Sequence, residues 1–224
     1  MIELLDSIPL WFILSSVALI AGFVDAIAGG GGLLTLPALL MTGMPPLAAL
    51  ATNKLQSTMG TATATLLMLR QRRVKWRDVK PLMMAAFIGS VLGTLIVQLI
   101  NTEALTVIMP IVIASIGVYF LVTPTVDEHN KKPRISSNLY SKIIVPIIGC
   151  YDGVFGPATG SFFALAGRSL RAQPFLQATA VAKTLNFSTN FASLIVFIFA
   201  GHVLWLVGLV MMLGQLIGAW LGSH

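Results

Sequence analysis

Charged residues are scarce in this chain. Only 10% of its 224 residues are Asp, Glu, Lys or Arg, while 56% are hydrophobic, and an average soluble domain carries about 25% charged residues. This shortage excludes an ordinary soluble domain. Long apolar stretches recur instead, notably over 81–100 and 104–122, and each can span a bilayer. The sequence therefore predicts an all-α, polytopic membrane protein.

The chain also lacks the residues that mark several other classes of protein. Its single cysteine, Cys150, leaves no internal disulfide or thiolate cluster, and its 3 histidines show no metal-ligand spacing. The N-terminus carries Glu3 and Asp6 where a cleavable signal peptide would be positive. Because no nucleophile–base set occurs either, we expect no enzyme, no cofactor and no bound metal.

The net charge of +6 comes from cations that flank the apolar stretches. Most of the 14 Lys and Arg residues lie in or beside three polar loops, and these are Arg70, Arg72, Arg73, Lys75, Arg77, Lys80, Lys131, Lys132, Arg134, Lys142, Arg168 and Arg171. This pattern is typical of cytoplasmic loops rather than of a nucleic-acid-binding face. We therefore expect the chain to contact a lipid bilayer and no nucleic acid.

Two similar glycine-rich stretches indicate an internal repeat. GFVDAIAGGGG at 22–32 and GCYDGVFGPATG at 149–160 place Asp25 and Asp152 127 residues apart. Further along, an offset of 129 relates Pro45 to Pro174, Lys54 to Lys183, Trp76 to Trp205, and Gly89 to Gly218. So many matches at one offset predict a duplication, with a first repeat at 1–122, a cytoplasmic linker at 123–137 and a second repeat at 138–224.

The charges of equivalent loops predict that the two repeats are inverted. In the first repeat the loop at 41–47 is uncharged and the loop at 70–80 is basic, whereas in the second repeat 168–174 is basic and 200–205 has no Lys or Arg. Because Lys and Arg collect on the cytoplasmic side, the reversed bias predicts opposite orientations in the membrane. We expect the N-terminus outside and the basic loops inside.

Each repeat is expected to open with a broken helix. The expected arms and helices are 8–44 interrupted at 25–32, then 47–69, 81–101 and 103–122, followed by arms at 138–154 and 160–172 and helices at 174–199 and 203–223. The short second arms are expected to re-enter the membrane rather than cross it. In the alternative model each broken segment crosses once, which would leave Arg168 and Arg171 outside.

The repeat also predicts one helix more than the chain contains. Residues 103–122 of the first repeat imply a partner near 232–251, but the sequence stops at His224. We therefore expect the final helix to be missing, either because the sequence is a fragment or because this copy lost the helix.

Polar side chains inside the apolar segments are the candidates for a binding site. A charged residue at the centre of a membrane helix costs about 2.5–3.5 kcal/mol, so such groups are expected to face a wet cavity or each other. The candidate substrate-binding residues are Asn53, Lys54, Gln56, Lys183, Asn186 and Asn190, with Gly30, Gly31 and Gly160 at the helix breaks, and Asp25 and Asp152 are candidates for charge balance or proton coupling. The alternatives are lysines that snorkel to the interface and aspartates that cap helices or pair with lysines.

Four stretches resemble the TauE/SafE family of membrane permeases, the sulfite-exporter family. They are GFVDAIAGGGGLLTLPALL at 22–40, ALATNKLQS at 49–57, YDGVFGPATGSF at 151–162 and ATAVAKTLNFSTN at 178–190. The resemblance implies transport of small anions such as sulfite, thiosulfate or sulfonates across a bacterial cytoplasmic membrane, without an ATP-hydrolysing domain. We expect a secondary transporter that works by alternating access, with an anion channel or a structural membrane subunit as alternatives.

Overall fold

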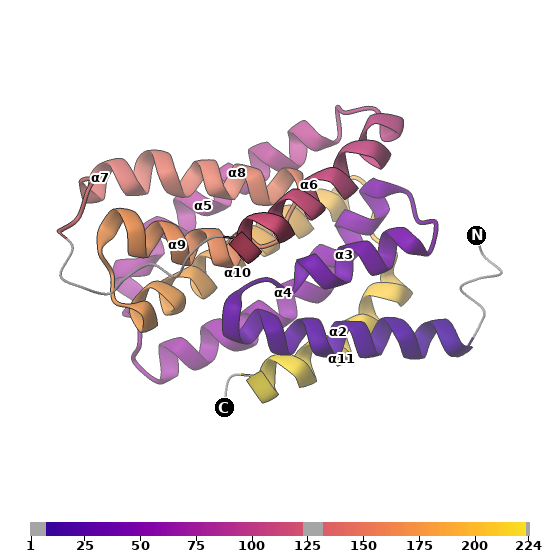
Figure 1. Cartoon of the computed structure of the whole chain (residues 1–224), viewed down its shortest axis with the longest axis horizontal. Coiled ribbons are helices and arrows are strands. Elements are labelled where there is room, and N and C mark those ends of the chain that lie inside the picture. The colour runs from indigo at the N-terminus through magenta and orange to yellow at the C-terminus, as the bar shows by residue number, and fades with distance from the viewer. Residues whose placement is uncertain (1–7, 123–131, 223–224) are drawn as a thin grey trace.

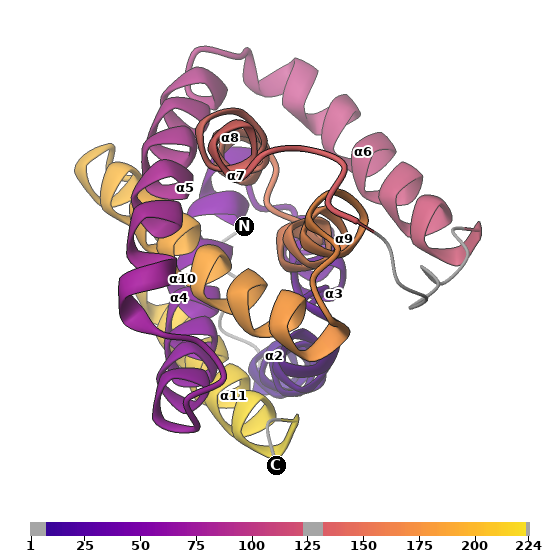
Figure 2. The ribbon, with the colours of Figure 1, turned by 90° about the vertical axis from the view of Figure 1, so that its left-hand side faces the viewer.

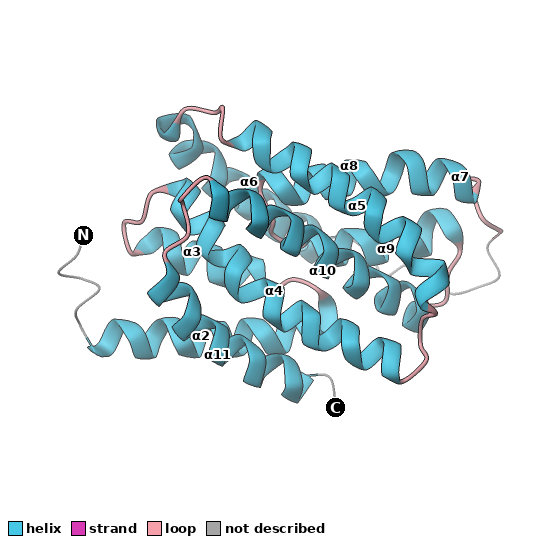
Figure 3. Cartoon of the chain, turned by 180° about the vertical axis from the view of Figure 1, so that it is seen from behind, coloured by secondary structure: helices cyan, strands magenta, loops and turns pink. Residues whose placement is uncertain are grey.

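The computed structural model describes residues 8–122 and 132–222, and this part of the chain contains helices and no strand (Figure 3). The helices are α2 (Ile8–Ala28), α3 (Gly32–Met41), α4 (Pro46–Arg70), α5 (Trp76–Val97), α6 (Thr102–Val122), α7 (Ser137–Leu139), the π-helical turn η1 (Tyr140–Ile144), α8 (Val145–Val154), α9 (Thr159–Arg171), α10 (Phe175–Phe199) and α11 (Trp205–Gly222). The expected all-α class is confirmed. Most of the predicted linker, 123–131, lies outside the described residues.

Five helices are long and apolar enough to cross a membrane, namely α2, α5, α6, α10 and α11. Helix α4 matches α10 in length but is much more polar. Helices α3 and α9 have 10 and 13 residues, which corresponds to roughly 15 and 20 Å. Both are therefore shorter than the bilayer core of about 30 Å. The multi-pass membrane architecture is confirmed by the five long apolar helices in the described part of the chain.

The basic segments lie together at one end of the molecule. In Figure 1 the α4–α5 turn, the α9–α10 turn and α7 are all at the left-hand end, whereas the start of α2 and the α3–α4 and α10–α11 turns are at the right-hand end. Figure 2 looks onto the end with the basic segments. Because cations collect on the cytoplasmic side of bacterial membrane proteins, this end corresponds to the side expected to face the cytoplasm.

Helices α4 and α10 form the buried centre and run in opposite directions. The Leu204 amide donates a hydrogen bond to Thr52 Oγ1 at 3.2 Å, so the end of α10 lies beside the start of α4. Near the other end of α4, Thr65 Oγ1 donates to the Lys183 carbonyl at 3.2 Å. This is the relation that inverted repeats require of equivalent helices, while the inversion and the missing helix stay predictions.

Glycines let pairs of outer helices approach backbone to backbone. A Cβ at Gly89 in α5 would collide with the Pro146 carbonyl of α8, and a Cβ at Gly218 in α11 would collide with the Leu19 carbonyl of α2. Small residues at helix contacts are the usual way that membrane helices pack closely. The two equivalent glycines of the sequence repeat therefore form two equivalent contacts, each of which joins one repeat to the other.

The helix limits follow the expected ones, with one clear difference. The helix expected at 81–101 begins at Trp76 and ends at Val97. Hydropathy marks only the apolar part of a helix, whereas Arg77, Asp78 and Lys80 continue the helix toward solvent, where their charges stay hydrated. The π-helical turn that precedes α8 was not expected from the sequence.

Candidate functional site

The two helix breaks touch each other at the centre of the molecule. The first break, residues 29–31, separates α2 from α3, and the second, residues 155–158, separates α8 from α9. A Cβ at Gly29 would lie 2.8 Å from the carbonyl carbon of Gly160. Gly29 and Gly156 also adopt positive φ angles of 79° and 91°, which glycine reaches without strain. Glycine is therefore required both for the turns and for the contact between them.

A buried ion pair joins α4 to α8 beside the second break. Lys54 Nζ of α4 lies 2.7 Å from Asp152 Oδ2 of α8, and neither side chain is more than 1% exposed. The two atoms are close but not aligned as a hydrogen bond. Asp152 Oδ1 accepts a hydrogen bond from Thr159 Oγ1 at 2.6 Å. The carboxylate thus neutralises Lys54, which is one of the alternatives expected for the aspartates.

The first break binds its lysine differently. Lys183 Nζ of α10 donates hydrogen bonds to the backbone carbonyls of Asp25, at 3.2 Å, and of Ala26, both in the last turn of α2. The Asp25 carboxylate accepts a hydrogen bond from the Gly31 amide at 3.2 Å instead. In the described part of the chain, no ion pair joins Lys183 to a carboxylate. The helix C-terminus, with its partial negative charge, compensates this ammonium group.

Buried amides adjoin both breaks. Asn53 Oδ1 accepts hydrogen bonds from Thr35 Oγ1 at 2.6 Å and from Gln56 Nε2 at 3.0 Å. Asn186 Oδ1 accepts a hydrogen bond from Asn190 Nδ2 at 3.2 Å. The Asn53 oxygen thus accepts two hydrogen bonds and the Asn186 oxygen one, and the NH₂ groups of both residues can donate to a ligand.

A small polar cavity lies between the breaks, α4 and α10. Its lining includes Gly32 and Thr159, the first residues of α3 and α9, together with the predicted site residues Asp25, Asn53, Asn186 and Asn190. Two helix N-termini therefore point their partial positive charge at this space. The centre of a water molecule can move within about 10 Å³ of it, which is enough for one water.

A larger pocket of about 390 Å³ adjoins the small cavity and shares Asp25, Gly29 and Asn186 with it. The larger pocket also contains Lys183 in its lining, and it follows α10 outward to Phe175, the first residue of that helix. Since α10 begins at the end with the basic segments (Figure 1), the pocket extends toward that end. Lys54 lines neither of these two cavities and is 0% exposed.

The structure thus brings most of the predicted residues together around the touching breaks. The small cavity is lined by Asp25, Asn53, Asn186 and Asn190, and the larger pocket by Lys183 and Gly160. Lys54 pairs with Asp152, and Gln56 donates a hydrogen bond to Asn53. The first break contains Gly30 and Gly31. Thr35 and Thr159, whose hydroxyls bond to the side chains of Asn53 and Asp152, were not predicted as site residues. Their signal in the sequence is a hydroxyl within one helical turn after each break.

Comparisons with known proteins show which proteins this chain is similar to. Residues 14–224 match the family model described as sulfite exporter TauE/SafE. A "Probable membrane transporter protein" of Haemophilus influenzae is 47% identical over 216 residues, which cover 96% of this chain and 85% of that protein. The "Probable membrane transporter protein YfcA" of Escherichia coli K12 is 45% identical, over 95% of this chain and 79% of its own length. No solved structure matches this chain.

Proposed function

The chain belongs to the sulfite exporter TauE/SafE family of membrane transporters, and from this premise we propose that it is a secondary transporter that moves a small anion across the bacterial cytoplasmic membrane by alternating access. Sulfite, thiosulfate and sulfonates are the anions to test first. The observation that carries the proposal is Lys183, a membrane-embedded lysine without a carboxylate partner among the described residues, at the inner end of a 390 Å³ pocket.

The surroundings of Lys183 suit an anion. Asn186 lines the same pocket, and the N-termini of α3 and α9 lie at the adjoining breaks. Backbone N–H groups at such broken helices are a common anion-binding device in transporters. The basic segments at the outer end of the pocket would attract anions from the cytoplasmic side. Together these groups supply charge and hydrogen-bond donors along one route.

The difference between the two lysines supports alternating access. Lys54 is sealed by Asp152, while its repeat equivalent, Lys183, borders a pocket. An inverted repeat can exchange the conformations of its two halves. In the opposite state, Lys183 would pair with Asp25 and Lys54 would be released from Asp152 to face the other side of the membrane. On this mechanism the structure corresponds to a state open toward the cytoplasm.

The different surroundings of Asp25 and Asp152 make Asp25 the candidate for proton coupling. Asp25 borders both cavities, and its carboxylate has one recorded partner, the Gly31 amide. Asp152 is instead held by Lys54 and Thr159. A negative Asp25 would repel an anion bound at Lys183, and protonation of Asp25 would remove that repulsion. We therefore propose that a proton is cotransported with the anion.

Counterflow in proteoliposomes tests the transport function. Vesicles loaded with unlabelled sulfite, thiosulfate or methanesulfonate are diluted into the same labelled anion, and uptake is compared for the unmodified chain, Lys183→Ala and Lys142→Ala. Lys142 is an exposed lysine outside the site. We expect trans-accelerated uptake that Lys183→Ala abolishes and Lys142→Ala retains. Flux without counterflow would favour an anion channel, and no flux of any anion would favour a structural subunit.

A further inference from the structure

The larger pocket is much roomier than an inorganic oxyanion requires. Its 390 Å³ would hold about a dozen water molecules at their volume in the liquid. It also reaches along α10 from Asn186 to Phe175, a distance of about 16 Å at the helical rise. An anion with the size of sulfite would occupy only the region beside Lys183 and leave most of the pocket to water.

The outer walls of this pocket are mostly apolar. Their apolar side chains are Ile27, Ala64, Phe120, Ala164, Phe175 and Ala182, and Ser161 and Thr179 also contribute to the lining. Thr61 also lines the pocket, but its hydroxyl donates to the Ser57 carbonyl at 2.7 Å, so this side chain adds little polarity to the wall. Pockets of about 300–1,000 Å³ with mostly apolar walls and a few polar groups are characteristic of sites for organic ligands.

The polar groups at the inner end are suited to a single negative charge. The Lys183 ammonium has three N–H donors, and its recorded hydrogen bonds go to two carbonyls, so one donor remains. Asn186 lines the same pocket, and its NH₂ group adds hydrogen-bond donors. When Asp25 is protonated, as in the proposed coupling, one ammonium and one amide can bind one anionic group, whereas a second negative charge in this pocket would have no cation of its own.

We infer that the substrate is a monovalent organic anion with a compact apolar tail. Its anionic group binds Lys183 and Asn186, and its tail lies against Phe120, Ala164 and Phe175 in the larger pocket. The inference rests on the transport function proposed above and narrows its substrate class. Arg168, whose guanidinium carbon lies 5.2 Å from the centre of the Phe175 ring, places a positive charge at the outer end of the same route.

A series of straight-chain alkanesulfonates, from methanesulfonate to hexanesulfonate, tests this inference by competition against labelled methanesulfonate in proteoliposomes. Each methylene that leaves water for the apolar pocket should tighten binding about fourfold until the pocket is filled. Ala164→Phe places a ring in the tail region and should reduce the preference for hexanesulfonate over methanesulfonate at least tenfold.

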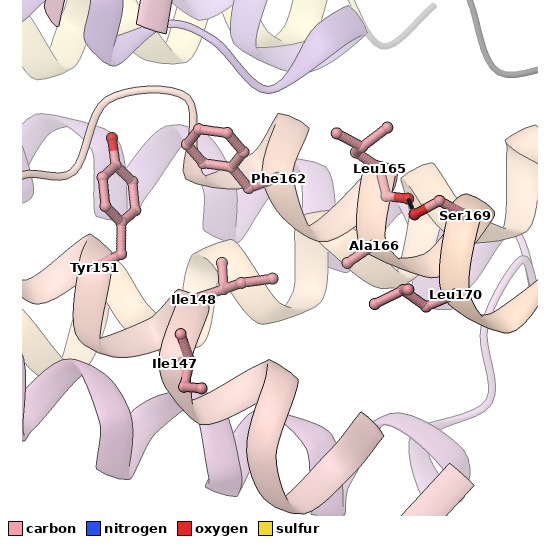
Figure 4. A pocket seen from close by; sticks show the side chains of 8 residues that line it. All are labelled: Ile147, Ile148, Tyr151, Phe162, Leu165, Ala166, Ser169 and Leu170. Atoms are coloured by element: carbon pink, nitrogen blue, oxygen red, sulfur yellow. Dashed lines mark hydrogen bonds between the residues drawn. The ribbon is translucent and has the colours of Figure 1, made fainter. Parts of the chain in front are cut away.

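Leu165→Phe is the matched control. Leu165 is next to Ala164 in α9 but lines a separate groove between α8 and α9, with Ile148 and Tyr151 (Figure 4). The same added ring at this position should leave the preference for the longer chain as it is in the unmodified protein. The preference for hexanesulfonate over methanesulfonate is a ratio measured within one variant, so it does not depend on how much of that variant is folded.

The possible results separate the two proposals. A preference that rises with chain length and falls in Ala164→Phe alone supports the apolar-tail site. Uptake that depends on Lys183 but not on chain length would overturn the inference and leave the transport function standing. A rising preference that Ala164→Phe does not change would place the tail elsewhere and overturn the inference as well. If no anion in the series is taken up in a Lys183-dependent way, both proposals are wrong.

Discussion

The buried ion pair between Lys54 and Asp152 allows a quantitative prediction. In Asp152→Asn, the Thr159 hydroxyl can still donate to the remaining oxygen, but Lys54 loses its countercharge while it stays 0% exposed. Removal of one partner from a buried pair typically costs about 3–5 kcal/mol. For a chain of this length that corresponds to a fall in Tm of about 6–20 °C.

The double variant Lys54→Met/Asp152→Asn tests the cause of this loss. Replacement of both members of a buried pair by neutral residues of similar volume is often close to neutral, so we expect most of the lost stability to return. Transport should stay impaired, because the pair is required to form and separate in the alternating mechanism. Asp78→Asn, which removes an exposed carboxylate from the first turn of α5, should change Tm by no more than about 2 °C.

Thermal unfolding of the detergent-solubilised protein, followed by intrinsic tryptophan fluorescence or by the soluble fraction after heating, measures these changes. The reasoning fails if Asp152→Asn is as stable as the unmodified chain, because Lys54 would then need no carboxylate in the dominant state. It also fails if the double variant is no more stable than Asp152→Asn. Altered side-chain packing, rather than the unpaired charge of Lys54, would then account for the lost stability.

Three further predictions concern packing, coupling and orientation. Gly93→Ala should sharply reduce the yield of monodisperse protein in size-exclusion chromatography, because its Cβ would collide with a carbonyl of α8, whereas Gly117→Ala, with open space around it, should keep the normal yield. Asp25→Asn should lose the stimulation of uptake by an inward proton gradient, and persistence of that stimulation in the remaining uptake would exclude Asp25 as the coupling group. In spheroplasts, a membrane-impermeant maleimide should label Thr42→Cys at the α3–α4 turn. Arg72→Cys at the α4–α5 turn should stay unlabelled until the membrane is permeabilised. The reverse result would contradict the proposed orientation.

Much of the fold was predictable because it depends on short-range properties of the sequence. Hydropathy places the membrane helices, and two glycine-rich stretches place the breaks at 29–31 and 155–158, since glycine both weakens a helix and accepts positive φ angles. The distribution of Lys and Arg predicts that the basic segments lie at one end, as they do in Figure 1. Each of these inferences uses neighbouring residues and needs no knowledge of tertiary contacts.

The candidate site was predictable as a set of residues for a similar reason. Lysines, aspartates and asparagines inside apolar helices must find polar partners, whichever partners these are. The repeat further indicated that Lys54 and Lys183 are equivalent, as are Asp25 and Asp152. Sequence reasoning thus selected residues that lie close together in the structure, without any statement of which lysine bonds to which group.

Only the tertiary structure decided those pairings. Lys54 pairs with a carboxylate 98 positions away along the chain, whereas Lys183 bonds to the carbonyls of Asp25 and Ala26 at a helix end. The equivalence of the repeats predicts the same environment for both lysines, yet Lys183 alone borders the larger pocket. Small differences in how α8, α9 and α2 lie against α4 and α10 decide which atoms come within bonding distance. Such differences arise from contacts summed over the whole molecule, and no local stretch of sequence contains them.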